Sequence, residues 1–138
     1  MAVEFFMTMR PPTVTAQERK VTVKDGKPSF YDPPELRAAK AMLTDALAGY
    51  APADRIEAPL ELVVKWCFLP KGVLPGELDR EWHRWRTEKP DTDNLNKLLK
   101  DCMTKVGFWK DDAQVCREII EKHWAAVPGI YIRISELE

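Results

Sequence analysis

Two short acidic stretches carry the side chains best suited to chemistry in this sequence. Asp91 and Asp93 stand two residues apart just ahead of an apolar run, and Asp111 and Asp112 follow that run as a pair. Carboxylates are favoured at a helix N-terminus, where backbone N–H groups also point outward, and Lys97 lies one helical turn further on. Such hard oxygen ligands beside a cation suit Mg²⁺ with a phosphate. If one acid of the second pair meets the first pair, three carboxylates are available to bind metal.

A plainer interpretation fits the same residues. Aspartates before an apolar run are typical helix caps, and an Asp-Asp pair is typical of a solvated turn. Under the first interpretation a bound metal activates water for attack on a phosphodiester, whereas under the second the acids only shape the backbone. The residue types alone leave both interpretations open.

The separation of the two stretches limits how they can meet. A helix over residues 94–106 is about 20 Å long, at about 1.5 Å per residue. Residues 107–112 span about 20 Å when fully extended, so Asp112 only just returns to Asp93 within one chain. Either the helix ends early, or the sheet runs alongside it, or a partner subunit completes the site.

Periodicity and turn residues predict the elements that position these acids. Strict alternation over residues 60–68 indicates a strand, and apolar residues at helical spacing indicate a helix over residues 94–106. The expected order is a strand at 3–9, a helix at 33–48, the strand at 60–68, the helix at 94–106 and strands at 113–126 and 130–134. A weaker signal predicts a small hairpin around Val21–Gly26, inside a basic loop over residues 10–27. We expect a single α+β domain over residues 1–138, with a mixed sheet of about four strands and two helices on one face.

Cap residues give each helix an expected start. Asp32 is the predicted N-cap of the first helix, with Glu35 completing a capping box. Asp93 is the predicted N-cap of the second helix, and Gly107 is its expected end. Because Asp91 and Asp93 are two residues apart in an extended lead-in, both carboxylates should point to the same side.

Composition narrows the class of protein. The chain has 138 residues and a net charge of −1, which argues against nucleic-acid binding by bulk charge alone. No apolar run approaches the roughly 20 residues of a membrane span, and the first residues make a poor signal peptide. Cys67, Cys102 and Cys116 fit neither a disulfide framework nor a zinc site, and we expect all three in the core of a cytoplasmic protein, bacterial or from a phage-infected cell.

The order of these residues resembles a known family. The run Asp91-Thr92-Asp93-Asn94-Leu95-Asn96-Lys97, followed by a short helix and an Asp-Asp pair, is similar to the signature of the RusA family of Holliday-junction resolvases, especially its phage and prophage members. The interval of 21 residues from Asp91 to Asp112 also matches. The resemblance covers about residues 60–134 well and the N-terminal third loosely.

The resemblance implies a homodimeric endodeoxyribonuclease that resolves four-way DNA junctions by paired nicks in recombination and repair. It implies Mg²⁺ as the cofactor, with Mn²⁺ as a substitute. The implied catalytic residues are Asp91, Asp93, Asp112 and Lys97, and the same three acids with Asp111 are the implied metal ligands. Two other classes remain alternatives: a non-catalytic dimeric DNA-binding protein, and a metal-dependent phosphohydrolase on a smaller substrate.

Basic and aromatic side chains ahead of the signature are candidates for contact with DNA phosphates and bases. The segment from Trp82 to Arg86 alternates the two kinds, and it fits a DNA-facing loop and a packed amphipathic segment equally well. Phe108 and Trp109 fit hydrophobic contacts that close a helix better than a wedge into a junction. The candidate DNA-binding residues are Lys89, Arg84, Arg86, Arg10, Arg19 and Lys20.

Overall fold

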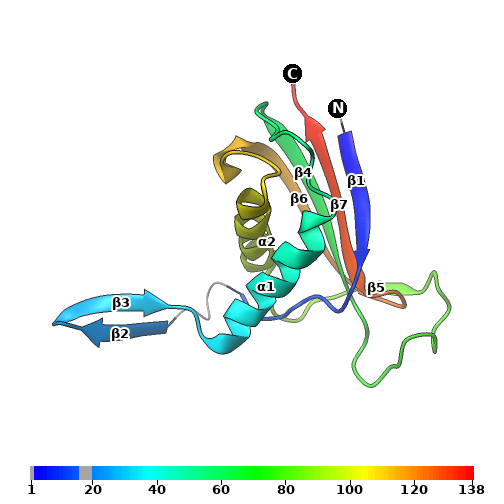
Figure 1. The fold of residues 1–138 in the computed structure, drawn as a ribbon. Helices are drawn as coiled ribbons and strands as arrows, with labels where there is room; N and C mark the ends of the chain where they lie inside the picture. Colours follow the sequence, from blue (N-terminus) through cyan, green and yellow to red (C-terminus); the bar gives the residue numbers. More distant parts are fainter. Residues whose placement is uncertain (1, 16–19) are drawn as a thin grey trace.

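The computed structural model describes residues 2–15 and 20–138, and its main body is a mixed sheet with both helices on one face (Figure 1). Five strands follow the order β1-β7-β4-β6-β5, in which β4 and β6 are parallel and the other neighbours antiparallel. A separate hairpin, β2–β3, projects from the body. The elements are β1 (Ala2–Thr8), β2 (Lys20–Lys24), β3 (Lys27–Tyr31), α1 (Pro34–Ala48), β4 (Leu60–Phe68), β5 (His83–Trp85), α2 (Thr92–Val106), the 3₁₀ turn η2 (Asp112–Gln114), β6 (Val115–Ala125) and β7 (Gly129–Glu136).

Strand β4 is the centre of the core because it lies between β6 and β7. Its alternation places every second side chain toward the helices, and all five of these are buried: Leu60, Leu62, Val64, Trp66 and Phe68. The matching side chains of α1 and α2 complete one continuous apolar cluster with those of β7. The prediction of an α+β fold with two helices over one sheet face is confirmed.

The structure corrects the predicted caps. Helix α2 starts at Thr92 with Asp91 as its N-cap, so Asp93 lies inside the first turn and is not the cap. Helix α1 has Pro33 at its N-cap position, and Asp32 instead forms an ion pair with Lys40 at 2.7 Å. Asp91 and Asp93 both have side chains suited to a cap, and only the backbone decides which of them occupies the position.

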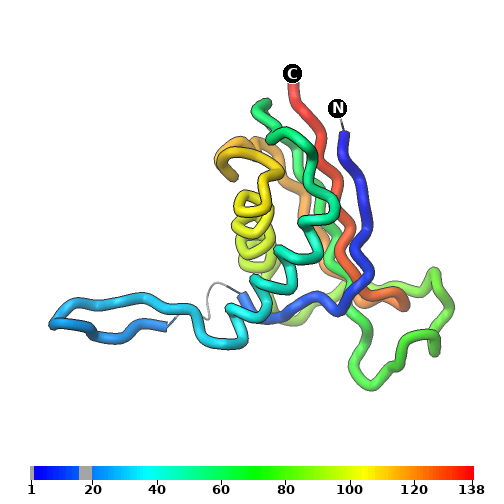
Figure 2. Tube along the Cα trace, in the orientation of Figure 1, coloured from blue at the N-terminus to red at the C-terminus, as the bar shows by residue number. Residues whose placement is uncertain are grey.

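The main sheet has one strand more than the four expected. Strand β5 spans only His83–Trp85 within a charged segment, too short to show periodicity, and it raises the main sheet to five strands. The weak hairpin signal is confirmed as β2–β3. Between β4 and β5 the chain makes a long excursion away from the sheet, which Figure 2 shows as the green loop. Among the described residues, no helix has the length and apolar content to span a membrane.

A buried amide links the signature helix to the sheet. Asn96 is only 1% exposed. Its side-chain oxygen accepts a hydrogen bond from Trp66 Nε1 at 2.7 Å, and its amide nitrogen donates one to Glu118 at 2.8 Å. Glu118 also accepts from Lys100 at 3.2 Å. Buried polar groups are costly when unpaired, so this network fixes the position of α2 on β4 and β6.

Replacing Asn96 with alanine should therefore lower the free energy of unfolding by about 1–3 kcal/mol, because the indole N–H loses its acceptor in a buried position. Urea unfolding followed by tryptophan fluorescence measures the change. Asn94→Ala, on the same helix but outside this network, is the control and should cost less. Equal losses in the two variants would show that the amide network does not anchor the helix.

Candidate active site

The N-terminus of α2 presents two carboxylates to solvent. Asp91 is the N-cap, with a side chain 51% exposed, and Asp93 is exposed in the first turn. Lys89 Nζ lies 3.5 Å from both carboxylate oxygens of Asp91, and the exposed Lys97 is one turn beyond Asp93. The first-turn N–H groups and the positive end of the helix dipole also face this region. The arrangement suits a divalent cation or a phosphate.

The backbone just before Asp91 is held by a side chain from β6. Lys122 Nζ donates hydrogen bonds to the carbonyl of Glu88 at 2.8 Å and to the carbonyl of Pro90 at 2.7 Å. Burial, followed by the charge of Arg86, lowers the pKa of Lys122, whereas the nearby carboxylate of Asp91 acts in the opposite direction. A cation from the sheet thus fixes the entry to the signature helix.

Arg86 binds the carbonyl of Lys89, which lies between the two carbonyls bound by Lys122. Its guanidinium donates to the Lys89 carbonyl at 2.5 Å and lies over the rings of Phe68 and Trp124, 4.3 and 4.4 Å from their centres. The residue is only 9% exposed, and burial lowers its pKa. The expectation that Arg86 contacts DNA is not met in this structure, because the residue is covered and a terminal nitrogen of its guanidinium binds the backbone.

Sequence reasoning did not identify Lys122 as part of this region. Its position supplies one signal: β6 alternates, and Lys122 shares the helix-facing side with Ile120 and Trp124. A lysine on a covered face needs acceptors for its ammonium group. Nothing local to the sequence shows that those acceptors are the carbonyls of residues 88 and 90.

The second acidic pair lies at the other end of α2. Lys122 contacts the segment before α2, Glu118 contacts Asn96 in the middle, and Asp112 precedes β6. Helix and strand therefore run in opposite directions (Figure 1). Because α2 has 15 residues, about 22 Å at 1.5 Å each, Asp112 is roughly a helix length from Asp91.

Of the three ways in which the acids could meet, the two within one chain do not occur in this structure. The helix does not end early, and the sheet does not bring Asp112 back to the N-terminus of α2. The Asp111 carboxylate accepts the N–H of Ala113 at 2.9 Å in a capping box with Gln114, so it shapes the turn η2. No group of three or more potential metal-ligating His, Cys, Asp or Glu side chains occurs among the described residues. One chain alone does not fit a three-carboxylate metal site.

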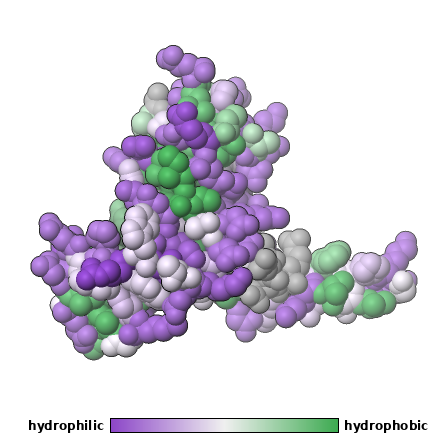
Figure 3. All heavy atoms as spheres, turned by 180° about the vertical axis from the view of Figure 1, so that it is seen from behind, coloured by the Kyte–Doolittle hydropathy of each residue, from purple (hydrophilic) through white to green (hydrophobic). Residues whose placement is uncertain are grey.

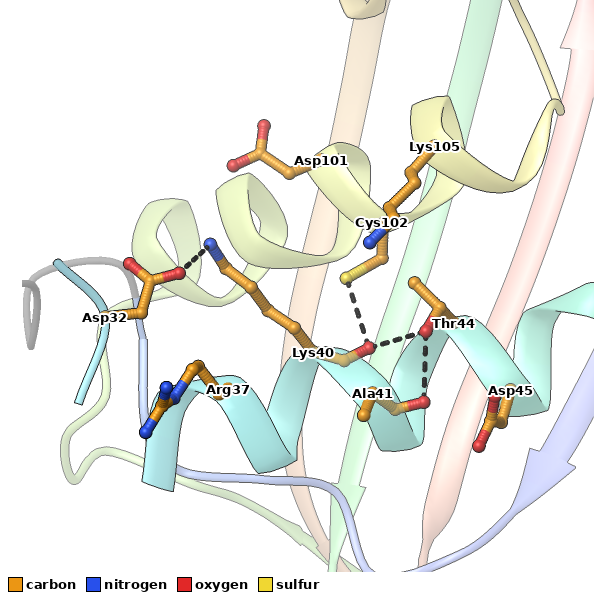
Figure 4. A pocket seen from close by; sticks show the side chains of 9 residues that line it. All are labelled: Asp32, Arg37, Lys40, Ala41, Thr44, Asp45, Asp101, Cys102 and Lys105. Carbon is orange, nitrogen blue, oxygen red and sulfur yellow. Dashed lines mark hydrogen bonds and ion pairs between the residues drawn. The ribbon is translucent and has the colours of Figure 1, made fainter. Parts of the chain in front are cut away.

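The hollow between α1 and α2 does not contain the acids of the signature either. It has a volume of about 450 Å³, and Figure 4 shows its lining of helix side chains with the Lys40–Asp32 ion pair at one side. Asp101 and Lys105 come from the opposite wall. Charges of both signs line this hollow, which makes it a poor receptor for a polyanion.

Four of the other predicted DNA-contacting residues are exposed, and one lies outside the described residues. Lys89, Arg10 and Lys20 are exposed, and so is Arg84, whose guanidinium lies 5.1 Å from the centre of the Trp82 ring. Arg19 lies outside the described residues. Within the segment before the signature, Trp85 is 64% exposed on β5, so only part of that segment is packed.

The cysteines and the aromatic pair after α2 are placed as follows. Phe108 and Trp109 are fully buried, in agreement with the hydrophobic interpretation. Burial raises the pKa of the Cys102 thiol to about 11. Burial is also the main cause that raises the pKa of the half-buried Cys67 thiol to about 11. Cys116 is exposed, so the expectation that all three cysteines lie in the core is wrong for this one.

Comparison with known proteins identifies the class to which this fold and signature belong. A family model described as endodeoxyribonuclease RusA matches residues 11–135. The chain is 31% identical over 117 residues to the crossover junction endodeoxyribonuclease rusA of Lactococcus phage r1t, covering 83% of each chain. It is 26% identical over 121 residues to YqaN of Bacillus subtilis, covering 84% of each. It is 41% identical over 54 residues to crossover junction endodeoxyribonuclease RusA of Escherichia coli K12, covering 38% of this chain and 45% of that one. The chain therefore belongs to the RusA family of endodeoxyribonucleases.

Replacing Lys122 with methionine should release the two carbonyls before Asp91 and cost about 1–3 kcal/mol in unfolding free energy. Hydrogen exchange in residues 87–92 should accelerate. Lys65→Met is the matched control: Lys65 is half-buried on the adjacent strand, on the opposite sheet face, where it contacts the Tyr131 ring. Equal exchange rates in the two variants would contradict the role given to Lys122.

Proposed function

We propose that this protein is a Mg²⁺-dependent, structure-selective endodeoxyribonuclease that resolves four-way DNA junctions by paired nicks, acting as a homodimer in recombination and repair. The observation that carries the proposal is the pair of exposed carboxylates at the N-terminus of α2, in a member of the RusA family. Relatives named as crossover junction endodeoxyribonucleases supply the substrate class. Free thiols at all three cysteines suit action in the cytoplasm of a bacterial cell.

The separation of the acids supports a site shared between two copies. Asp91 and Asp93 provide two ligands, and two carboxylates hold Mg²⁺ with several waters and a phosphate. We propose that Asp112 of a second copy provides the third ligand, with Asp111 nearby, because Asp112 of the same chain is at the far end of α2. Mn²⁺ should substitute for Mg²⁺, since the ligands are all oxygens.

The chain's own residues divide the remaining tasks. Lys97 and the N–H groups at the start of α2 bind the scissile phosphate and oppose its developing charge. Arg84, Lys89 and Arg10 contact flanking phosphates from exposed positions. A divalent ion, when bound, supplies a water of lowered pKa and a positive charge beside the phosphate. A two-fold dimer presents two equivalent sites, which suits paired nicks in a nearly symmetric junction.

Asp93→Asn should keep junction binding and lower the nicking rate about 10²–10³-fold, the usual effect of removing one electrostatic contact in an active site. The assay is a labelled four-way junction with Mg²⁺, with Mn²⁺ and with EDTA, in which EDTA should abolish nicking by the wild type. Asp101→Asn, an exposed acid on the same helix, is the control and should nick normally. Binding without nicking by the wild type would favour a DNA-binding protein, and turnover of mononucleotides alone would favour a smaller substrate.

A mixture of two inactive variants tests the shared site. In a dimer of Asp93→Asn with Asp112→Asn, one site carries both changes and the other carries neither if Asp112 is supplied across the dimer. Random exchange of subunits should then restore about a quarter of the wild-type sites, as single nicks. A mixture that stays inactive after verified exchange would contradict the shared arrangement, without bearing on whether the wild type is a nuclease.

A further inference from the structure

The β2–β3 hairpin is an arm that stands clear of the sheet and helices (Figures 1 and 3). Its turn is formed by Asp25 and Gly26 with φ of 52° and 74°, the left-handed pair of a tight hairpin turn. Every strand residue of the arm is exposed except Ser29, which is half-buried. A two-stranded hairpin alone is only marginally stable, so contact with a partner would stabilise this arm.

The register of the arm separates two chemically different faces. Cross-strand partners share a face, as Lys20 does with Tyr31 and Lys24 with Lys27. One face is apolar and consists of Val21, Val23, Pro28 and Phe30. The opposite face, here called the donor face, consists of Lys20, Thr22, Lys24, Lys27, Ser29 and Tyr31. Every side chain of the donor face donates hydrogen bonds, and none is a carboxylate.

The donor face carries positive charge that the described part of the chain does not neutralise. Lys24 and Lys27 are directly opposite each other, and like charges in such a pair destabilise a hairpin. None of the three lysines of this face has an ion pair with another described residue. An anion bound across this face would relieve that repulsion. The chain as a whole has a net charge of −1, so the positive charge on the arm is local.

We propose that the donor face binds the phosphate backbone of a duplex arm of the DNA substrate. This rests on the proposed function for the choice of polyanion. Lys20 and Lys24 are four residues apart on one strand, about 13–14 Å at 3.4 Å per residue. Phosphates along one DNA strand advance about 3.4 Å per base pair along the helix axis, so the two ammonium groups meet phosphates about four steps apart. Thr22, Ser29 and Tyr31 donate to phosphate oxygens between them.

The donor face favours nucleic acid over a protein partner for the arm. A second copy of the chain would be held by the apolar face, in which Val21, Val23 and Phe30 are 58%, 75% and 69% exposed. That contact would leave the repulsion between Lys24 and Lys27 unrelieved. A polyanion would neutralise the lysines and accept hydrogen bonds from the other donors of this face. Contact with a second copy is therefore treated as an alternative outcome of the test.

The triple variant Lys20→Gln, Lys24→Gln, Lys27→Gln should bind duplex and four-way junctions more weakly. The slope of log Kd against log salt concentration should fall by about 3, close to one unit per phosphate contact. Fluorescence anisotropy across a KCl series measures this slope. The corresponding triple arginine variant should restore the slope.

Val23→Thr, on the apolar face of the same arm, is the matched control and should leave the salt slope unchanged. A wild-type slope in the triple glutamine variant would overturn the proposal. It would also be overturned if Val23→Thr dissociated a dimer in sedimentation while the glutamine variant bound DNA normally, since the arm would then contact a second copy. Nicking of the junction by the wild type tests the proposed function separately. If the wild type does not nick but the glutamine variant has a reduced salt slope, the proposed nuclease function is contradicted and DNA binding by the arm is supported.

Discussion

Three consecutive backbone carbonyls, those of residues 88–90, are bound by two cationic side chains, and the position of the signature depends on this contact. Lys122 donates hydrogen bonds to the carbonyls of residues 88 and 90, and Arg86 donates one to the carbonyl of residue 89. Arg86 is itself wedged between aromatic rings, so the segment is tied to the core and not only to a neighbouring loop. Preorganised groups cost no rearrangement at the moment of reaction, which is the condition for electrostatic catalysis.

The length of α2 acts as a second constraint. The helix runs antiparallel to β6 between the two acidic pairs, so each pair lies at a different end of the helix. The Asn96 network locks that orientation by satisfying Trp66 and Glu118 at once. If the proposed shared site is correct, a single copy offers two carboxylates, and the third comes only from a second copy. Assembly would then limit cleavage to places where two copies meet on one substrate.

Local periodicity was sufficient to predict much of this architecture. The alternation of β4 and the apolar spacing of α2 held in the structure because both elements bury one continuous face. The choice between Asp91 and Asp93 as the cap could not be made, since each has the chemistry for it. Strand β5 was missed because three residues show no period. Whether Asp112 meets Asp91 within one chain could not be decided from the sequence, because this depends on the direction in which β6 returns, which tertiary packing decides. Arg86 was misjudged because a charged residue gives no local sign of being covered by Phe68 and Trp124.

The edge of the sheet along β6 carries charged side chains that oppose pairing with another strand. Strand β6 has 11 residues, yet β5 pairs with it only from His123 to Ala125. Over most of its length the strand therefore has no neighbour on that side among the described residues, and such an edge is a template for stacking of identical molecules. Arg117, Glu118 and Glu121 place charges of both signs along it. Pairing of identical copies along this edge would have to desolvate these charged groups, so the charges oppose growth of the sheet from one molecule into the next.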